Sequence, residues 1–406
     1  MERKLEEFAM NENNPKWVNA IKREEKLYNR GNDLRSEFER DYTRIIYSNG
    51  YRRLRNKTQV FFSPSNDHVC TRMEHTTCVA AISYTIGKTL GLNLELIQAI
   101  ATAHDIGHTP FGHAGERILN KISVEELDEN FWHEKNGLYF VDRIELLEDD
   151  KGFKNNLNLT YAVRDGIISH CGEVDENNLK PREEYINLND YIKPNQYMPY
   201  TWEGCVIKLA DKISYIGRDI EDAIDMGLLE SDDLEELNEL ITKKFKKTIN
   251  NSNIINVLIN DLCLNSNEEG LRFSKEIVEI MNEIKRYNYK KIYQSERLRN
   301  SDKYFNIIIN TVFSTLKNGY KQKDTISNLK DLSKKSQLFL NFLEWIRKYY
   351  IYEKREDEGL SNIAIYNLEN EGSYTKAVID YISGMTDNCA IKAYKDIISF
   401  DDFYKK

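Results

Sequence analysis

The adjacent pair His104-Asp105 closes an apolar stretch in the segment AIATAHDIGHTPFGHAGE. An ionised Asp beside a His is costly to bury unless a divalent cation compensates its charge. Further ligands must come from other segments, and the sequence offers His75 upstream and Asp211 within VIKLADKISYIGRDIEDA. Two imidazoles and two carboxylates form a borderline-hard ligand set that leaves room for water on an octahedral ion. The pattern therefore predicts one divalent metal ion, Mn²⁺, Mg²⁺, Fe²⁺ or Ni²⁺, rather than a closed structural zinc.

A His-Asp dipeptide alone also has an ordinary structural interpretation, a buried His beside its carboxylate partner at the end of a helix. The metal is favoured because His75, the His104-Asp105 pair and Asp211 follow one another in order. Each of them lies within an apolar segment that has helical spacing.

The segment around Asp211 carries further polar groups. Asp211, Tyr215 and Asp219 recur at intervals of four, which places them on one face of a helix. Such a stripe is usually solvated, but here the apolar run VIKLA begins the segment. A buried end that carries a metal ligand, with Lys212 and Tyr215 beside it, suits a phosphate-binding pocket.

Three helices must position these residues. Apolar periodicity predicts a helix over residues 72–90, closed by Gly91, and a second helix over residues 93–104. A third helix is predicted over residues 205–226, with Gly227 as its stop. The candidate metal ligands fall on or directly after these three segments.

The composition favours helices over sheet. The 406 residues include only 19 glycines and six prolines, with 40% hydrophobic and 30% charged residues. We therefore expect an all-α fold, a helical core with additional C-terminal helices and at most a small β-hairpin. The best strand candidates are residues 59–63 and 69–71.

The histidines divide the chain. All seven lie between His68 and His170, and no histidine occurs beyond that point. Helical periodicity in the histidine-free part is clearest over residues 232–250 and 333–354. The regions that we predict are an N-terminal arm or helix over residues 1–40, a catalytic core over 41–230, and a C-terminal helical region over 231–406 that packs on the core and takes part in oligomerisation.

Charge and cysteine usage narrow the class of protein. A net charge of −9 without a long basic block argues against a dedicated nucleic-acid surface but leaves a nucleotide substrate open. Six cysteines without a CxxC pair are typical of reduced thiols. The segment MERKLEEFAM lacks a signal-peptide core, and no run approaches the roughly 18 apolar residues of a membrane span. We expect a soluble, cytoplasmic protein without a membrane partner.

Seven segments carry a family resemblance: RDYTRIIYSNGYRRLRNKTQVF, TRMEHTTCVA, AHDIGHTPFGHAGE, FWHEKNG, DGIISHCGE, KLADKISYIGRDIEDA and DYISGMTDNCA. Together they resemble the HD-domain deoxynucleoside triphosphate triphosphohydrolases, which include bacterial dGTPases and animal SAM/HD-domain dNTPases. The resemblance implies an HD-domain helical core. It also implies metal-dependent hydrolysis of dNTPs, dGTP or several of them, to deoxynucleoside and inorganic triphosphate by water attack at the α-phosphate.

The resemblance implies a role for individual positions. The metal ligands that it implies are His75, His104, Asp105 and Asp211. The residues implied to assist the attack, or to lie beside the phosphates, are His113, Glu116 and His133. The positions implied to bind phosphate and sugar are Gln59, Arg72, Lys212, Tyr215 and Asp219.

These implied roles agree with the chemistry of the residue types. Hydrolysis at phosphorus needs an activated water, neutralised phosphate charge and a proton for the leaving oxygen. Arg72 offers a bidentate fork and Lys212 a point charge to the triphosphate. His113 is suited to acid–base work near neutral pH, with Glu116 three residues on to orient it. The flat ring of Tyr215 could crowd a ribose 2′-hydroxyl and so favour deoxyribose.

The implied partners are the dNTP substrate, a further Mg²⁺ that accompanies the triphosphate, a nucleotide activator at an interface, and other copies of the chain in a tetramer or hexamer. Nucleic acid is less favoured because of the acidic balance. The sequence departs from common family patterns at Tyr47 and Tyr51, where His and Phe are usual, and at Cys389, where an aromatic residue is common. These departures leave base preference and activation open.

Two other classes of function stay open. One is a different HD-type phosphohydrolase that acts on a cyclic nucleotide, an alarmone or a nucleoside monophosphate. The other is an oligomeric nucleotide sensor or nucleic-acid-binding protein with secondary hydrolysis. His108 and His170 are ambiguous and predict no second metal, and His68 is expected on the surface.

Overall fold

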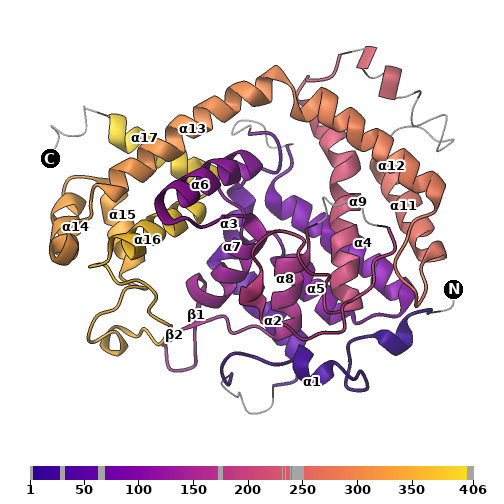
Figure 1. Cartoon of the computed structure of the whole chain (residues 1–406), viewed down its shortest axis with the longest axis horizontal. Coiled ribbons are helices and arrows are strands. Elements are labelled where there is room, and N and C mark those ends of the chain that lie inside the picture. Colours follow the sequence, from indigo (N-terminus) through magenta and orange to yellow (C-terminus); the bar gives the residue numbers. More distant parts are fainter. Residues whose placement is uncertain are drawn as a thin grey trace.

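Three apolar helices form the centre of the molecule, as the spacing predicted. The structure is a computed structural model, and it describes residues 3–27, 33–62, 69–171, 177–230, 232–233, 235–237, 239 and 251–399. The central helices are α4 (Arg72–Leu90), α5 (Leu94–Ala103) and α9 (Trp202–Asp225). Helix α4 packs against both α5 and α9, and Figure 1 shows the three close together in its right half, below α12 (Lys275–Asn288).

Local signals set the ends of these helices. Thr71 and Glu74 form a capping box at the start of α4, and Gly91 ends the helix in the left-handed conformation (φ 91°). Asn93 caps α5 by accepting hydrogen bonds from the next turn. Helix α9 begins three residues before the predicted start because Thr201 supplies its cap.

Shorter elements surround this centre. The elements before α4 are η1 (Glu6–Phe8), α1 (Trp17–Ala20), α2 (Glu37–Tyr47), α3 (Asn49–Arg53) and η2 (Leu54–Asn56). Those between α5 and α9 are α6 (Gly112–Leu127), α7 (His133–Tyr139), η3 (Phe140–Ile144), α8 (Tyr161–Ser169) and η4 (Leu188–Asp190). Helix α8 is buried along its whole length and packs on α5, α7 and α9. The N-terminal segment lies on the body, since Leu5 N donates to Leu90 O (2.9 Å) and Met10 N to Glu203 Oε1 (2.9 Å).

The sheet content is small, as predicted, but its position was predicted wrongly. The two strands are β1 (Leu146–Glu148) and β2 (Lys154–Asn156), which pair antiparallel with Leu146 opposite Asn156. The predicted hairpin is reduced to one antiparallel bridge between Thr58 and Thr71. The bridge has no room to extend on one side, because η2 ends just before it and α4 begins just after it. Residues 63–68, with His68, lie outside the described part.

The C-terminal part continues in helices. Their bounds are α11 (Asn251–Asn265), α12 (Lys275–Asn288), η5 (Tyr289–Tyr293), α13 (Glu296–Lys317), η6 (Gln322–Asp324), α14 (Thr325–Ser333), α15 (Gln337–Ile346), η7 (Glu356–Glu358), α16 (Glu371–Ser383) and α17 (Asp387–Ile398). The helix predicted over residues 232–250 falls largely outside the described residues. The single helix predicted over 333–354 is wrong. Ser336 breaks it by capping Phe339 N and donating to Asp396 Oδ2 (2.7 Å), and the chain leaves the helix after Ile346.

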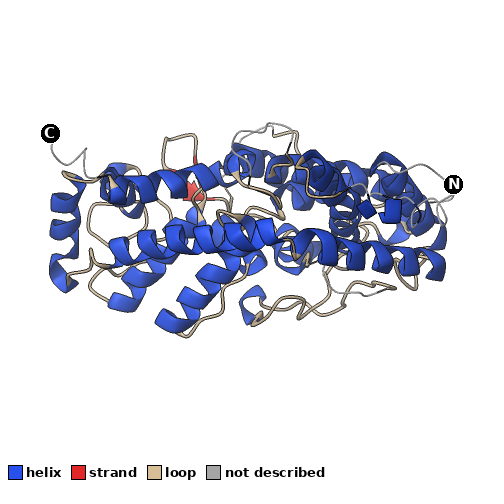
Figure 2. Ribbon diagram, turned by 90° about the horizontal axis from the view of Figure 1, so that it is seen from above, coloured by secondary structure: helices blue, strands red, loops and turns tan. Residues whose placement is uncertain are grey.

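Helices α12 and α13, joined by η5, form an arch over the central helices (Figure 1). The arch rests on α9 through α12 and η5, and on α6 through α13. Seen from above, the molecule is elongated and shallow, and the regular secondary structure of its described residues is helical apart from the two short strands (Figure 2). Among the described residues, no helix has both the length and the apolar character that crossing a bilayer requires.

Candidate functional site

Six histidines converge beneath the arch. They are every histidine within the described residues, and each comes from a different point of the fold: His75 on α4, His104 at the end of α5, His108 in the following loop, His113 on α6, His133 on α7 and His170 at the end of α8. The rings of His104 and His170 lie 5.0 Å apart, and those of His108 and His133 stack at 3.9 Å.

Three of the predicted metal ligands form one cluster. Ligand atoms of His75, His104 and Asp211 all lie within 4.8 Å of one another. Nε2 of His75 is 2.9 Å from Asp211 Oδ1 and 3.7 Å from Asp105 Oδ2. Nε2 of His104 is 3.5 Å from the other Asp105 oxygen. The structure therefore brings all four predicted ligands together.

The donor atoms of this cluster suit a cation. Nδ1 of His104 donates to Ala101 O (2.7 Å), since a carbonyl oxygen can only accept, and this leaves Nε2 with a free lone pair. That Nε2 atom is buried and has no hydrogen-bond partner among the residues that the structure describes. Burial alone would raise the pKa of Asp105, but His104, His108 and Arg72 hold it well below its usual range. A carboxylate that stays ionised and an imidazole without a partner are the groups that a divalent ion would satisfy.

A second group of side chains faces the metal cluster. Glu116 Oε2 lies 3.2 Å from Nδ1 of His113 and 3.1 Å from Nδ1 of His133. Burial opposes protonation of His133, yet Glu134 and Glu116 raise its pKa to about 10. Burial acts to raise the pKa of Glu116. His133 and His113 outweigh this effect and hold the pKa far below its ordinary value. Nδ1 of His113 faces Glu116, and about half of the His113 side chain is exposed. Nε2 is therefore the nitrogen available to solvent or to a substrate.

A cavity of about 650 Å³ joins the two groups. The predicted residues that line it are Gln59, Arg72, His75, Asp105, His113, Glu116, His133, Asp211, Tyr215 and Asp219. His104 is fully buried and is not among the lining residues. Lys212 is buried on α9 but is not among the lining residues, so the structure does not bring it to the cavity.

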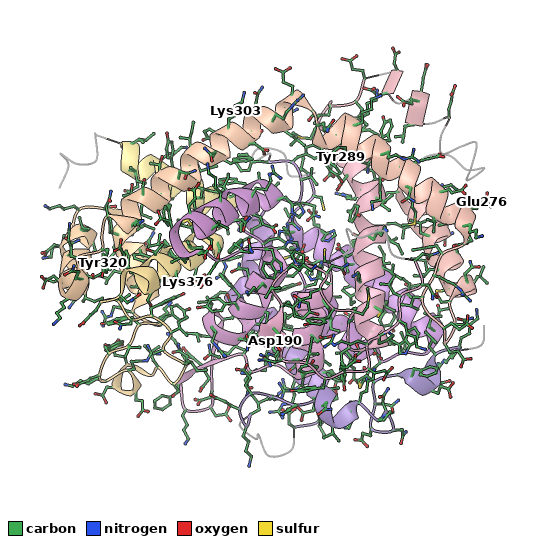
Figure 3. The ribbon with its side chains drawn as sticks, in the orientation of Figure 1. Asp190, Glu276, Tyr289, Lys303, Tyr320 and Lys376 are labelled. Carbon is green, nitrogen blue, oxygen red and sulfur yellow. The ribbon has the colours of Figure 1, made fainter. Side chains whose placement is uncertain are left out.

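The arch supplies wall residues that the sequence did not reveal. Tyr293, at the end of η5, donates its hydroxyl to Asp219 Oδ2. Burial raises the pKa of Asp219 to about 6. Tyr289, at the other end of η5, stands at the junction of α12 and α13 and is largely exposed (Figure 3). Neither tyrosine belongs to a motif or a histidine-rich segment, so no local signal marked them.

Asp387 is the first residue of α17 and lies in the segment DYISGMTDNCA. The sequence assigned no role to it. Its carboxylate accepts hydrogen bonds from Phe111 N (2.8 Å), from Thr58 N (2.9 Å) and from the Thr58 hydroxyl. Phe111 (φ 63°) and Gly112 (φ 56°) are both left-handed where the chain enters α6. Thr58 and Phe111 both line the cavity, so Asp387 at the start of α17 fixes the backbone at two points of its wall.

The loop after the His-Asp pair leaves no space for a side chain at Gly107. A Cβ there would lie 2.1 Å from both His133 O and Gly137 N, which are backbone atoms of α7. We expect Gly107→Ala to push α7 away and to lower the free energy of unfolding by about 3 kcal/mol. Thermal or urea unfolding measures this. Gly372→Ala is the control, because the nearest atom of the described residues to its added Cβ is Asn370 Oδ1 at 3.4 Å. Equal stability of the two variants would contradict the close packing.

Comparison with known proteins adds to this geometry. Residues 72–216 match the family model described as HD domain, and residues 345–396 match that described as phosphohydrolase-associated domain. The first match contains the four clustered ligands, and the second contains Asp387. A deoxyguanosinetriphosphate triphosphohydrolase-like protein of Caldanaerobacter subterraneus subsp. tengcongensis is 34% identical over 370 residues, 90% of this chain and 86% of its own. Proteins with the same description from Clostridium tetani and Rickettsia bellii are each 32% identical, over 90% of this chain and 86% and 93% of theirs.

Proposed function

From the premise that the chain belongs to the family of deoxyguanosinetriphosphate triphosphohydrolase-like proteins and is an HD-domain hydrolase, we propose the following reaction. It hydrolyses deoxynucleoside triphosphates, dGTP or several dNTPs, to deoxynucleoside and inorganic triphosphate. Water attacks the α-phosphorus, and the bond to the sugar 5′-oxygen breaks. The observation that carries the proposal is the cavity in which a His/Asp metal cluster faces the His113–Glu116–His133 group.

The proposed metal ligands are His75, His104, Asp105 and Asp211. A divalent ion held there, Mn²⁺, Mg²⁺, Fe²⁺ or Ni²⁺, would lower the pKa of a bound water and offset phosphate charge. The protein's own part is to orient the ligands: Ser214 Oγ lies 3.1 Å from Nδ1 of His75, and Ala101 O holds the His104 ring.

His113 is the proposed donor of the proton to the leaving 5′-oxygen. Glu116 fixes the His113 ring through Nδ1, so that Nε2 is free to meet the substrate. Glu116 also binds both Nδ1 (3.1 Å) and the backbone N (3.2 Å) of His133, which ties α6 to α7. Because the pKa of His133 is raised to about 10, its ring would be cationic near neutral pH. It would then neutralise phosphate charge.

The proposed phosphate anchor is Arg72, on the first turn of α4. Its guanidinium donates to Asp105 Oδ2 (3.0 Å) and to Gln59 O (3.3 Å), and it lines the cavity between the metal cluster and Gln59. This position allows contact with the triphosphate while Gln59 meets the sugar. Lys212 does not line the cavity, so the proposal for phosphate binding rests on Arg72.

The proposed sugar subsite lies between α9 and η5, where Tyr215 and Asp219 face Tyr293. We expect Tyr293→Phe to lower kcat/KM for dNTPs about tenfold, because the buried Asp219 carboxylate loses a donor, at a cost of about 1–3 kcal/mol. Steady-state kinetics with dNTP and the matching rNTP measures both rate and discrimination. Tyr304→Phe is the control, since Tyr304 on α13 is 43% exposed and does not line the cavity. A Tyr293→Phe enzyme with unchanged kinetics would remove this residue from the subsite.

A substrate panel tests the proposed activity. Four dNTPs and four rNTPs are supplied singly and mixed, with Mn²⁺ and with Mg²⁺. The proposal requires hydrolysis of at least one dNTP and not of its ribonucleotide. Cyclic nucleotides, alarmones and nucleoside monophosphates complete the panel. Turnover confined to one of those classes would replace the proposal with the corresponding HD-type activity.

The same panel addresses the proposed partners. Activity only in mixtures would support a nucleotide activator at an interface. Light scattering coupled to gel filtration, with and without dNTP, measures the proposed assembly into a tetramer or hexamer. A monomer with full activity would contradict the oligomer. Single-stranded nucleic acid, the less favoured partner, is tested by its ability to compete with dNTP hydrolysis.

A further inference from the structure

Lys57 is a buried cation to which the proposed reaction gives no task. It follows η2 directly and is 2% exposed. Its Nζ donates to His108 O, in the loop after the His-Asp pair, and to Ser383 O at the end of α16 (3.1 Å). Among the described residues, no ion pair joins Lys57 to a carboxylate. Removing an ammonium from water costs several kcal/mol, which two neutral carbonyl partners offset only in part.

The His108 carbonyl belongs to a residue that contacts both groups of the site. Nε2 of His108 lies 3.1 Å from Asp105 Oδ1, and its ring stacks on that of His133 at 3.9 Å. Nδ1 of His108 is buried and has no hydrogen-bond partner among the described residues, so a hydrogen bond fixes this ring at Nε2 only. A shift of the His108 backbone would therefore move a proposed metal ligand and a proposed phosphate-binding ring together.

A second side chain joins the same two elements as Lys57. Nδ2 of Asn136, on α7, donates to Gly107 O (2.7 Å) and to Ser383 Oγ (3.4 Å). The neighbouring carbonyls of Gly107 and His108 are thus both tied to the last residue of α16. Ser383 belongs to the phosphohydrolase-associated region and His108 to the HD region. Lys57 precedes both regions in the chain and connects them.

The charges around Lys57 do not favour its ammonium. Four charged groups face it from four places in the fold, Arg53 on α3, Arg72 on α4, Glu145 after η3 and Asp387 on α17. Burial, together with the two arginines, lowers the pKa of Lys57 to about 7, and the two carboxylates oppose this shift. A cation kept where burial works against its charge is more typical of functional sites than of structural ones.

We propose that Lys57 is a positioning residue of the hydrolysis, which acts by clamping His108 O to the end of α16. Through the His108 ring it holds the Asp105 carboxylate and the His133 ring in place. Lys57 is not among the residues that line the substrate cavity, so it acts through the loop and not on the nucleotide. The inference rests on the proposed function, and its test includes a measurement without nucleotide.

The kinetic test is the rescue of a truncated side chain. Lys57 lines a separate hollow of about 500 Å³, from which a small molecule can reach the space left by Lys57→Ala. Propylamine replaces the atoms that this change removes, and 1-propanol has the same size without the charge. We expect kcat for dNTP hydrolysis to fall about 100-fold with little change in KM. Propylamine should restore part of kcat in a saturable manner, and 1-propanol should not.

Three results overturn the proposal. They are a wild-type kcat in the folded Lys57→Ala protein, equal restoration by the alcohol and the amine, and a loss that neither compound restores. Lys57→Met keeps the bulk of the side chain without its donor, and it should lose kcat without any response to propylamine. This variant keeps the proposal testable if the truncated protein does not fold, because a wild-type kcat in Lys57→Met overturns it as well. Circular dichroism confirms that each variant is folded.

Manganese affinity separates this inference from the proposed reaction. Metal-free full-length protein is dialysed against Mn²⁺ without nucleotide, and bound manganese is measured by elemental mass spectrometry. Loss of a partner that orients a metal ligand lowers affinity by about 10–100-fold, so Lys57→Ala should bind Mn²⁺ about tenfold more weakly. If the wild type hydrolyses no dNTP, the proposed function fails and the affinity alone decides. Equal affinity of Lys57→Ala and the wild type then overturns the inference.

Lys208→Ala is the matched control. Lys208 is also 2% exposed, and its Nζ donates to Asn195 Oδ1. Neither of these residues lines the substrate cavity. The control should keep its kcat and its manganese affinity and should not respond to propylamine. Losses in Lys208→Ala equal to those in Lys57→Ala would show that any buried ammonium has this effect, and they would overturn the specific role of Lys57.

Discussion

Asp211→Asn is expected to lower dNTP hydrolysis by about 1,000-fold or more while the protein stays folded. The substitution keeps the shape of the side chain but removes the negative charge that lies 2.9 Å from His75 Nε2. A metal contributes several kcal/mol to transition-state stabilisation in phosphoryl chemistry, and each 1.36 kcal/mol is a factor of ten in rate. The measurements are kcat/KM at saturating Mn²⁺ and the amount of manganese retained after dialysis.

Asp222→Asn is the control for this variant. Asp222 lies on the same helix and is also buried, but it accepts from Cys70 N (3.2 Å) and pairs with Arg218 (3.1 Å) outside the metal cluster. It should keep its metal, and its rate should change far less than that of Asp211→Asn. Similar losses in both variants would show that a buried negative charge on α9, rather than metal ligation, supports activity.

Asp387→Ala is expected to reduce kcat/KM by about 100-fold although Asp387 does not line the cavity. The change removes the acceptor of the buried Phe111 N–H and of the Thr58 donors. Each buried group left without a hydrogen bond costs about 1–3 kcal/mol. Without them the left-handed turn at Phe111 and Gly112 relaxes, and α6 shifts with His113 and Glu116. A displacement of about 1 Å at a catalytic group is enough for a loss of this size.

The readouts separate positioning from general instability. We expect the free energy of unfolding of Asp387→Ala to fall by about 3 kcal/mol, so kinetics are measured well below the unfolding temperature. The loss should appear in kcat more than in KM. Asp387→Asn keeps one acceptor oxygen and should recover part of the rate. The neighbouring Asn388→Ala is exposed and should behave as wild type. A normal kcat in a folded Asp387→Ala enzyme would contradict the role of α17.

The parts of the fold that local signals determine were predictable. The capping box at Thr71, the left-handed Gly91 and the cap at Asn93 set helix ends within one or two residues of their predicted positions. The grouping of the predicted metal ligands follows from these helices, because α4, α5 and α9 pack together. The all-α expectation and the family resemblance are confirmed for the same reason: they depend on patterns within single segments.

The parts that depend on distant contacts were not predictable. Asp387 and Thr58 are 329 positions apart, and Tyr293 meets Asp219 across 74 positions. Nothing local shows that Asp387 would contact Thr58 or that Tyr293 would contact Asp219. The break at Ser336 likewise depends on its hydrogen bond to Asp396 in another helix. His170 was ambiguous because its place beside His104 and His133 follows from the end of α8 reaching α5 and α7.

Hydrolysis of a dNTP in ¹⁸O-labelled water tests the central claim most directly. Attack at the α-phosphorus with loss of the 5′-oxygen predicts one ¹⁸O atom in inorganic triphosphate and an unlabelled deoxynucleoside. Phosphorus NMR and mass spectrometry identify both products. Labelled deoxynucleoside monophosphate with pyrophosphate, labelled orthophosphate, or label in the deoxynucleoside would contradict the proposed reaction.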